Sequence, residues 1–269
     1  MKISAKFTVV LFCAFAAAPF LWHFVSALKD AGEVTQIPPT ILPAHPTIAN
    51  YSDLFRQRPF LTYCINSLII AALSSLLSVA AGSLAAYRLA RMPSRPRTIT
   101  SSALLVLAFF PPVTFLFPLY ELVRTVGLIN HYWGLIIPHA ALNLPLTIWL
   151  LTGYFREIPK EIEEAAQIDG LGQFQILLRI IVPLAMPAIA TAGILAFVAS
   201  WNEYMLALTF MNADQARTVT VAIATLSGAF VYEIPWGLIA AGVVAGSLPL
   251  IVLTVFFQKR IVAGLTAGR

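Results

Sequence analysis

Charged side chains are scarce in this sequence of 269 residues. Only 11% of the residues are Asp, Glu, Lys or Arg, whereas 59% are hydrophobic. A soluble domain carries roughly 25% charged residues, so a chain this apolar lacks the polar surface that contact with water requires. The shortage of charge excludes an ordinary soluble domain and favours an integral membrane protein.

Cysteine and histidine are also rare. Cys13 and Cys64 both lie inside apolar runs, where a thiol acts as a small hydrophobic group, so we expect no disulfide. The four His residues show no metal-ligand spacing, and no Ser–His pair or metal cluster supports a membrane enzyme. A phosphate-binding loop of the type GxxxxGKS or GxxxxGKT is missing as well. We therefore expect no metal, no cofactor, no catalytic residue and no ATP binding by this chain.

Long hydrophobic runs are what the sequence has in place of charge. A lipid-exposed backbone must satisfy its hydrogen bonds within each span, and the alternating strands of about ten residues that a barrel needs do not occur. The sequence therefore predicts an all-α integral membrane fold with six transmembrane helices. The predicted spans are Ala5–Leu28, Leu61–Tyr87, Thr98–Val123, Tyr132–Gly153, Pro183–Leu208 and Trp236–Phe257.

The first span also has features of a cleaved signal peptide, because Lys2 and Lys6 precede it and small residues surround Phe15. Its apolar stretch, Phe7–Leu28, is longer than the 7–15 residues of such a region. We therefore expect a retained helix, with cleavage as the alternative.

Basic residues predict the orientation. With the N-terminus inside, twelve of the 17 Lys and Arg residues lie on the cytoplasmic side, and both termini are cytoplasmic. Their dispersal at span ends gives no sign of nucleic-acid binding, despite the net charge of +5. The five basic residues left outside are Lys29, Arg56, Arg58, Arg124 and Arg217.

We divide the chain into residues 1–60, with the first helix and an external proline-rich segment, a five-helix transmembrane core over residues 61–257, and a cytoplasmic tail over residues 258–269. The segment Lys29–Phe60 is predicted to be an extended external strap. For Phe210–Ile234 two possibilities stay open. The segment either re-enters the membrane or dips toward a vestibule, or it is an ordered surface loop.

The most unusual stretch, which we call the acidic hairpin, covers residues 154–183. It holds five of the twelve Asp and Glu residues, although it lies between two membrane spans. Pro159 and the glutamates after it predict a helix start, and Gly170 predicts its end. Ile162, Ala165, Ala166 and Asp169 recur at helical spacing, and we expect them to form one shallow face that contacts another protein.

The second half of the hairpin carries an apolar stripe at Phe174, Leu177, Leu178 and Ile181, which predicts a second helix. A hairpin lying on lipid headgroups is the alternative to a protein contact. The first helix is acidic, however, whereas helices that bind anionic lipid are usually basic.

The hairpin resembles a known motif. Glu164-Ala165-Ala166, then Gly170, Ile180 and Val182-Pro183, are similar in identity and spacing to the EAA loop of ABC importer permeases. Val182 departs from the leucine that usually precedes the proline. Asn66-Ser67, Trp201-Asn202-Glu203-Tyr204 and the stretch from Gln258 to Thr266 extend the resemblance to the six-span permease subunit of the maltose-type carbohydrate importers.

This resemblance implies a type I ABC importer permease fold and a place in a larger assembly in the cell inner membrane. A second permease subunit, two ATPase subunits and an external solute-binding protein would be the partners, with the lipid bilayer around them and a sugar as substrate. The helix over residues 160–171 would dock in an ATPase. The docking residues would be Glu164, Ala165, Ala166, Asp169 and Gly170.

Polar residues inside spans are the candidates for the transport pathway, because they are costly in lipid. Asn143, Trp201, Asn202 and Glu203 offer the hydrogen bonds and flat aromatic faces that suit a neutral sugar. His139 is interpreted as a histidine that packs between helices. The leading hypothesis is a non-catalytic subunit forming half of a sugar pathway, for an oligosaccharide, a disaccharide or a glucoside-type solute. Its rivals are a permease for a non-sugar solute such as a glycerol phosphate and a proton-coupled secondary carrier.

Overall fold

A computed structural model describes residues 2–226 and 234–266 of the chain, with side chains over residues 6–226 and 234–257. In these ranges the regular structure is helical and contains no strand, as predicted for an all-α protein. The longest helices are α1 (Lys2–Ala27), α4 (Phe60–Ala90), α7 (Trp133–Glu157) and α14 (Trp236–Thr266). Each of the four is long and apolar enough to cross a membrane.

Two further spans are each built from bent helices. The sequence prediction had treated the first of them, Thr98–Val123, as a single helix, whereas it let the other span begin at Pro183, after a separate helix of the hairpin. The pair formed by residues 94–108 and 112–125 bends by 84°, and the pair formed by residues 173–184 and 186–201 bends by 83°. Six spans result if each bent pair counts as one. The elements concerned are α5 (Ser94–Ala108), η1 (Pro112–Phe115), α6 (Leu116–Thr125), α9 (Gln173–Ile176), η2 (Leu177–Ile181), α10 (Val182–Leu184) and α11 (Met186–Trp201).

Proline explains the first bend. Pro111 is extended, with φ −61° and ψ 119°, because a residue that precedes another proline is driven out of the helical region. The predicted fifth span also ends early, since α11 stops at Trp201 and a separate helix, α12 (Met205–Phe210), follows. By contrast, Pro138 and Pro145 stay inside α7 without ending it.

The described residues form two compact units. The first contains Met1–Cys64 and Thr218–Ile251, and the second contains Ile65–Arg217 and Val252–Arg269. The first unit includes two short helices within the predicted extended strap, α2 (Ala31–Val34) and α3 (Ala49–Gln57). The strap is therefore only partly extended.

Local hydrogen bonds explain why the strap folds. The Asp30 side chain accepts from the Glu33 N–H at 2.7 Å and so begins α2. Glu33 in turn accepts from the Thr40 hydroxyl at 2.6 Å and from the Ala44 N–H at 3.0 Å, which holds residues 33–44 in a closed loop. Asn50, in α3, donates to the Ala27 and Lys29 carbonyls.

The segment after α12 contains η3 (Asp214–Ala216) and α13 (Val219–Ala224), which has buried Val219 and Val221 side chains. Its described part is thus ordered, while residues 227–233 of the predicted segment lie outside the described residues. The tail predicted from residue 258 begins inside α14, which continues to Thr266. Residues 267–269 of that tail also lie outside them.

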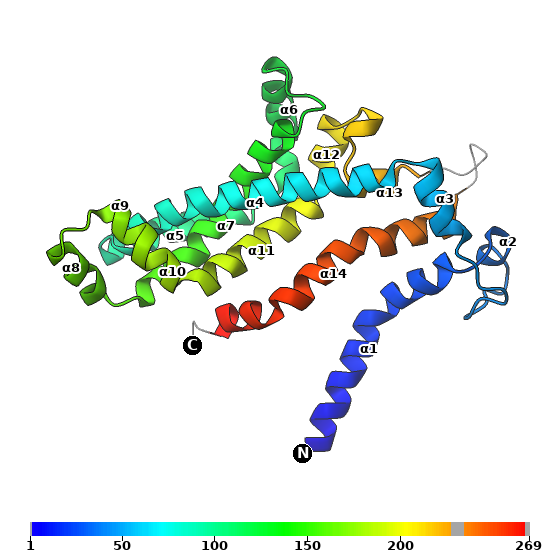
Figure 1. The fold of residues 1–269 in the computed structure, drawn as a ribbon, viewed down its shortest axis with the longest axis horizontal. Coiled ribbons are helices and arrows are strands. Elements are labelled where there is room, and N and C mark those ends of the chain that lie inside the picture. The colour runs from blue at the N-terminus through cyan, green and yellow to red at the C-terminus, as the bar shows by residue number, and fades with distance from the viewer. Residues whose placement is uncertain (1, 227–233, 267–269) are drawn as a thin grey trace. The chain divides into compact units, whose positions relative to one another are not determined.

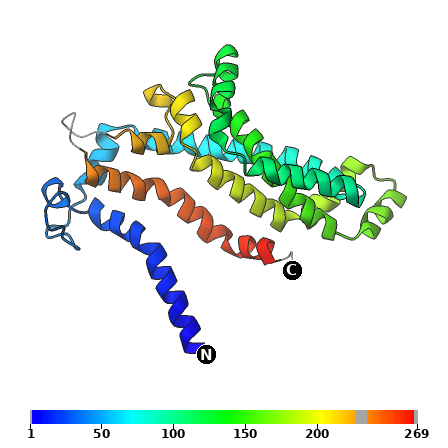
Figure 2. The same ribbon diagram turned by 180° about the vertical axis from the view of Figure 1, so that it is seen from behind.

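In the second unit, α7 packs along both α5 and α11, and these helices lie side by side in Figures 1 and 2. The acidic hairpin forms one end of this bundle, with α8 (Lys160–Ile168) at its tip, and α6 and α12 pack together at the other end. This arrangement places the two predicted sets of functional residues in one unit.

Candidate functional site

The first helix of the acidic hairpin, α8, begins and ends where the sequence predicts. Pro159 is its N-cap, and Glu161 and Glu163 occupy its first turn, where the positive end of the helix dipole favours carboxylates. Asp169 is its C-cap. The short, capped helix explains how an acidic segment can lie between two apolar spans.

Gly170 ends α8 in a Schellman motif. Its φ of +86° is in the left-handed region, the Gly170 N–H donates to the Gln167 carbonyl at 3.0 Å, and the Leu171 N–H donates to the Ala166 carbonyl at 3.0 Å. A Cβ at this position would meet no atom within 4 Å. The requirement for glycine therefore comes from the backbone conformation and not from crowding.

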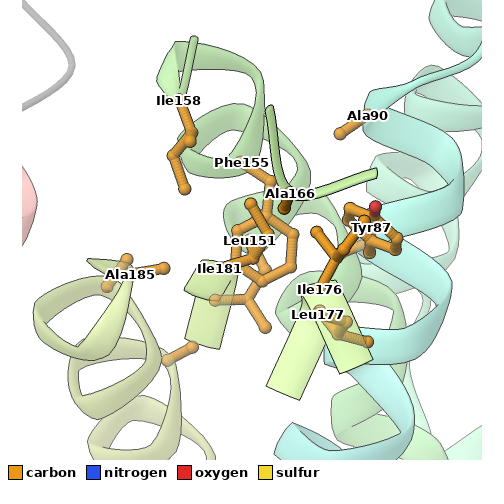
Figure 3. Packing of buried hydrophobic residues seen from close by; sticks show 13 residues of the cluster. Tyr87, Ala90, Leu151, Phe155, Ile158, Ala166, Ile176, Leu177, Ile181 and Ala185 are labelled. Atoms are coloured by element: carbon orange, nitrogen blue, oxygen red, sulfur yellow. The ribbon is translucent and has the colours of Figure 1, made fainter. Parts of the chain in front are cut away.

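The two faces of α8 have different surroundings. Ala166 is only 5% exposed and belongs to a hydrophobic cluster with Leu151, Phe155 and Ile176, as Figure 3 shows. Glu164, Ala165 and Asp169 face away from this cluster and are exposed. The prediction that Ala166 shares an outward face with Ala165 is therefore wrong, because one residue of offset turns the side chain by about 100°. Ala166 packs α8 against the rest of the chain, whereas Ala165 stays exposed and can contact another protein.

Further apolar side chains lie exposed on the hairpin. Ile168 is 87% exposed, and Phe174 and Leu178 are also exposed. The predicted stripe of the second helix is thus divided, since Leu177 and Ile181 are buried in the cluster whereas Phe174 and Leu178 are not. Residues 177–181 form a π-helical turn, which changes the spacing on which the prediction relied.

Glu163 connects the hairpin to α4 through polar contacts. Its carboxylate forms an ion pair with Arg91, whose Nε lies 2.7 Å from Oε1, and accepts from the Tyr87 hydroxyl at 3.0 Å. Arg91 also donates to the Ile158 carbonyl at 3.3 Å. We call Tyr87, Arg91 and Glu163 the clamp. Sequence reasoning counted Arg91 only as a cytoplasmic charge, although its spacing of four from Tyr87 places both on one helix face.

An open groove of about 520 Å³ lies beside the clamp. Arg88 and Arg91 come from the end of α4, and Lys160, Glu164 and Gln167 come from α8. Side chains of both signs of charge therefore line the groove, together with the apolar Met92 and Pro93.

The predicted pathway residues lie near the far end of the same unit. Asn143, on α7, donates to the Ser200 hydroxyl at 3.0 Å and to the Ala196 carbonyl at 3.3 Å, both on α11. Ser200 also accepts from the Ser74 hydroxyl of α4 at 2.9 Å. Asn143 thus connects helices through a polar seam that contains two serines absent from the predicted set. Serine is too common in spans to stand out in the sequence.

The break between α11 and α12 brings together the other three pathway candidates. Trp201 is buried and stacks on Phe197, with ring centroids 5.8 Å apart. Asn202 is exposed, and its side chain donates to the Val198 carbonyl at 2.9 Å. Of the two, only Asn202 offers a polar atom at an exposed position.

Glu203 acts on the helix that follows it. Its carboxylate accepts from the Leu206 N–H at 2.8 Å and the Ala207 N–H at 3.0 Å, two donors in the first turn of α12. The same carboxylate lies 3.3 Å from Nε2 of His139, which is buried on α7. His139 is therefore a packing histidine, as interpreted from the sequence, with a partner that the sequence did not reveal.

Comparison with known proteins agrees with this architecture. Residues 78–266 match the family described as the binding-protein-dependent transport system inner membrane component. The chain is 40% identical to the sulfoquinovosyl glycerol transport system permease protein SmoH of Agrobacterium fabrum, over 93% of this chain and 87% of that protein. It is 38% identical to the trehalose transport system permease protein SugB of Mycobacterium tuberculosis, over 96% and 93% respectively.

A third relative and one solved structure cover nearly the whole chain. The trehalose/maltose transport system permease protein MalG of Thermococcus litoralis is 37% identical over 100% of this chain and 95% of that protein. A crystal structure of a bacterial ABC transporter involved in the import of the acidic polysaccharide alginate matches with a TM-score of 0.79 and 24% identity, over 96% of this chain and 95% of that chain. The fold is thus the type I ABC importer permease fold.

The chain combines several apolar spans with one capped acidic hairpin, and the family match covers its residues 78–266. This chain therefore belongs to the binding-protein-dependent transport system inner membrane component family, as a multi-pass protein of the inner membrane.

Proposed function

We propose that this chain is the transmembrane subunit of an ATP-driven importer and forms half of the translocation pathway for a sugar. The observation that carries the proposal is that α8 has two different faces. One face packs into the chain's own hydrophobic cluster through Ala166, while the other face stays exposed. The three relatives above are named for transport of sulfoquinovosyl glycerol, trehalose, and trehalose or maltose. These names support a disaccharide, an oligosaccharide or a glucoside-type solute.

The exposed face of α8 would contact one of two cytoplasmic ATPase subunits. Glu164 and Asp169 would make polar contacts there, Ala165 would allow a close approach, and the exposed Ile168 would supply apolar contact. Hydrolysis of ATP would take place in the partners, so this subunit would couple without catalysing.

The remaining partners would be a second permease subunit and an external solute-binding protein. A related bacterial alginate transporter was solved in complex with a periplasmic protein that binds an alginate pentasaccharide, which supports the second of these. Both termini would face the cytoplasm, so that α8 lies on the side where ATP is available.

We propose Asn202 as the residue of the predicted pathway set that reaches substrate, because its side chain is exposed. Trp201, Asn143 and Glu203 would line or support the pathway through the contacts described above. A sugar offers hydroxyl groups that an amide side chain can bind both as donor and as acceptor.

Transport by the complete assembly tests this function. The chain is purified with its second permease and ATPase subunits and is reconstituted into liposomes with the binding protein outside and ATP enclosed. We expect labelled trehalose or maltose to accumulate only with ATP and binding protein. Accumulation driven by a proton gradient in liposomes without the ATPase would instead establish a secondary carrier. Uptake of glycerol phosphate, with neither sugar transported, would contradict the proposed substrate class.

A further inference from the structure

The clamp connects three elements at the cytoplasmic end of the second unit. Tyr87 and Arg91 lie in and just after the last turn of α4, and Glu163 lies in the first turn of α8. Arg91 also reaches the carbonyl of Ile158, the residue that ends α7. One arginine thus holds together the ends of two long helices and the start of the exposed one.

The contacts of the clamp are largely protected from water. The side chains of Glu163 and Arg91 are 8% and 18% exposed, and Tyr87 is buried. Two nitrogens of Arg91 contact one carboxylate oxygen, while the Tyr87 hydroxyl contacts the other. A largely buried ion pair in which both carboxylate oxygens accept hydrogen bonds holds its geometry, because breaking it would leave an uncompensated charge.

The apolar contacts of α8 alone leave it weakly attached. Ala166 is the one residue of α8 in the hydrophobic cluster, and a methyl group offers little resistance to sliding. The clamp adds a directional contact at the start of the helix, one turn away from Ala166. Together the two contacts fix both the position and the rotation of α8 relative to α4.

We propose that Arg91 and Glu163, with Tyr87, are positioning residues that make α8 and α4 move as one body, so that displacement of the exposed helix is passed directly to a membrane span. This inference rests on the proposed function. The clamp residues do not need to touch the ATPase or the sugar for this role, since their partners all belong to this chain.

The test measures how many ATP molecules are hydrolysed per sugar taken up by the reconstituted assembly. For R91Q and E163Q we expect this ratio to rise by about tenfold, which corresponds to about 1.4 kcal/mol of lost coupling. The double exchange R91E/E163R restores the opposite charges and should recover most of the coupling. Y87F removes a single hydrogen bond and should have a smaller effect.

Two neighbouring variants serve as controls. Arg95, near the start of α5, and Glu157, at the end of α7, are exposed residues, so R95Q and E157Q should keep the ratio of ATP hydrolysed to sugar taken up that the unchanged protein has. Co-purification of the ATPase subunits with each variant reports assembly separately from coupling.

The outcomes separate this inference from the proposed function. If the unchanged protein takes up no sugar with ATP, the proposed function is wrong and the clamp role with it. If it does take up sugar and R91Q and E163Q keep its ratio, only the clamp role is wrong. Loss of the ATPase subunits from R91Q or E163Q would also overturn the inference, because the clamp would then serve assembly.

Discussion

At the scale of single residues, several candidates for a function in transport first support the structure of their own chain. Glu203 caps α12 and contacts His139, Asn143 connects α7 to α11, and Gly170 provides the left-handed turn after α8. Their residue types and their positions in the sequence suggested a role in substrate binding, helix packing or docking. The partners show what each contributes to the structure first, and substrate or docking roles must be compatible with those contacts.

Gly170 should be sensitive to β-branched substitution. Valine is strained at a φ of +86°, and we expect G170V to lose roughly 1–2 kcal/mol of hairpin stability and to hydrolyse ATP without matching uptake. Asparagine tolerates the left-handed region, so G170N should retain most transport. Equal uptake by G170V and the unchanged protein in reconstituted liposomes would contradict a coupling role for this turn.

Glu203 is expected to matter for stability. A glutamine side chain places an NH2 donor where one of the two accepting oxygens of Glu203 lies, and it loses the charge near His139. E203Q should therefore destabilise the protein by about 1–3 kcal/mol, measured as faster thermal inactivation in detergent. N202A, at the exposed neighbour, should leave the inactivation rate unchanged while raising the sugar concentration for half-maximal uptake. An unchanged inactivation rate for E203Q would show that the cap contributes little.

At the scale of the element, α8 is defined by which side of it faces the core. Hydrophobic residues are too few in this short helix to indicate that side, since Ala165 and Ala166 are identical neighbours in the sequence. The structure distinguishes them, because Ala166 lies against Leu151 and Phe155 while Ala165 is exposed. The pair therefore provides a matched experiment.

A leucine at each position should have a different consequence. A166L places three extra carbon atoms in a filled core and should cost about 1–3 kcal/mol, detected as faster proteolytic cleavage within residues 159–172 of the isolated subunit. A165L should leave that cleavage unchanged but reduce the amount of ATPase that co-purifies. The assignment of the two faces would have to be reversed if A165L caused the faster cleavage.

The strap over residues 29–60 offers a pH-dependent element. The Thr40 hydroxyl and the Ala44 N–H, with a smaller contribution from Lys29, lower the pKa of Glu33 below its ordinary value, while desolvation and Asp30 oppose them. Because the folded pKa is the lower one, the full stabilisation is present above the ordinary pKa and is lost as the pH falls through the lowered value.

We expect the loop over residues 33–44 to become open to proteases as the pH falls below the ordinary range of a glutamate. In E33Q this rise in proteolytic cleavage with falling pH, the acid step, should disappear, because the loop should already be open at neutral pH. T40V removes the largest cause of the shift, so its step should move to higher pH. A step that keeps its position in T40V would assign the transition to another group.

At the scale of the whole molecule, the low charge and the long apolar runs require a bilayer around the described helices. The distribution of Lys and Arg predicts which of the two orientations the chain takes in that bilayer. This choice determines whether the exposed face of α8 is on the side where ATP is available, so the proposed function depends on it.

Labelling of single cysteines checks the orientation. In a background with Cys13 and Cys64 replaced by alanine, I168C tests the exposed end of α8, and L42C tests the exposed strap. A membrane-impermeant maleimide added to intact cells that lack the ATPase subunits should label L42C alone, and I168C should react only after permeabilisation. The reverse pattern would place α8 outside and exclude contact with a cytoplasmic ATPase.

The sequence by itself determined the class of the protein, the places of its spans and the limits of α8. These features depend on local properties, namely the length of an apolar run, a proline at a helix start and a glycine at its end. The bends of two spans were less predictable, because Pro138 continues a helix while Pro111 lies in a break. A second proline directly after Pro111 accounts for that break locally, whereas α7 continues through Pro138 while it packs along α5 and α11.

Only the tertiary structure decided which residues meet. Arg91 and Glu163 are 72 positions apart, and His139 and Glu203 are 64 apart, so no local pattern connects them. The tertiary structure also decided that Ala166 is buried and Ala165 is not. The helical period shows which residues share a face of α8, but burial depends on which other elements pack against that face. The resemblance of the hairpin to a known motif could thus be recognised from the sequence. Its attachment to α4 became visible only in the tertiary structure, because the residues that form the attachment are distant in the sequence.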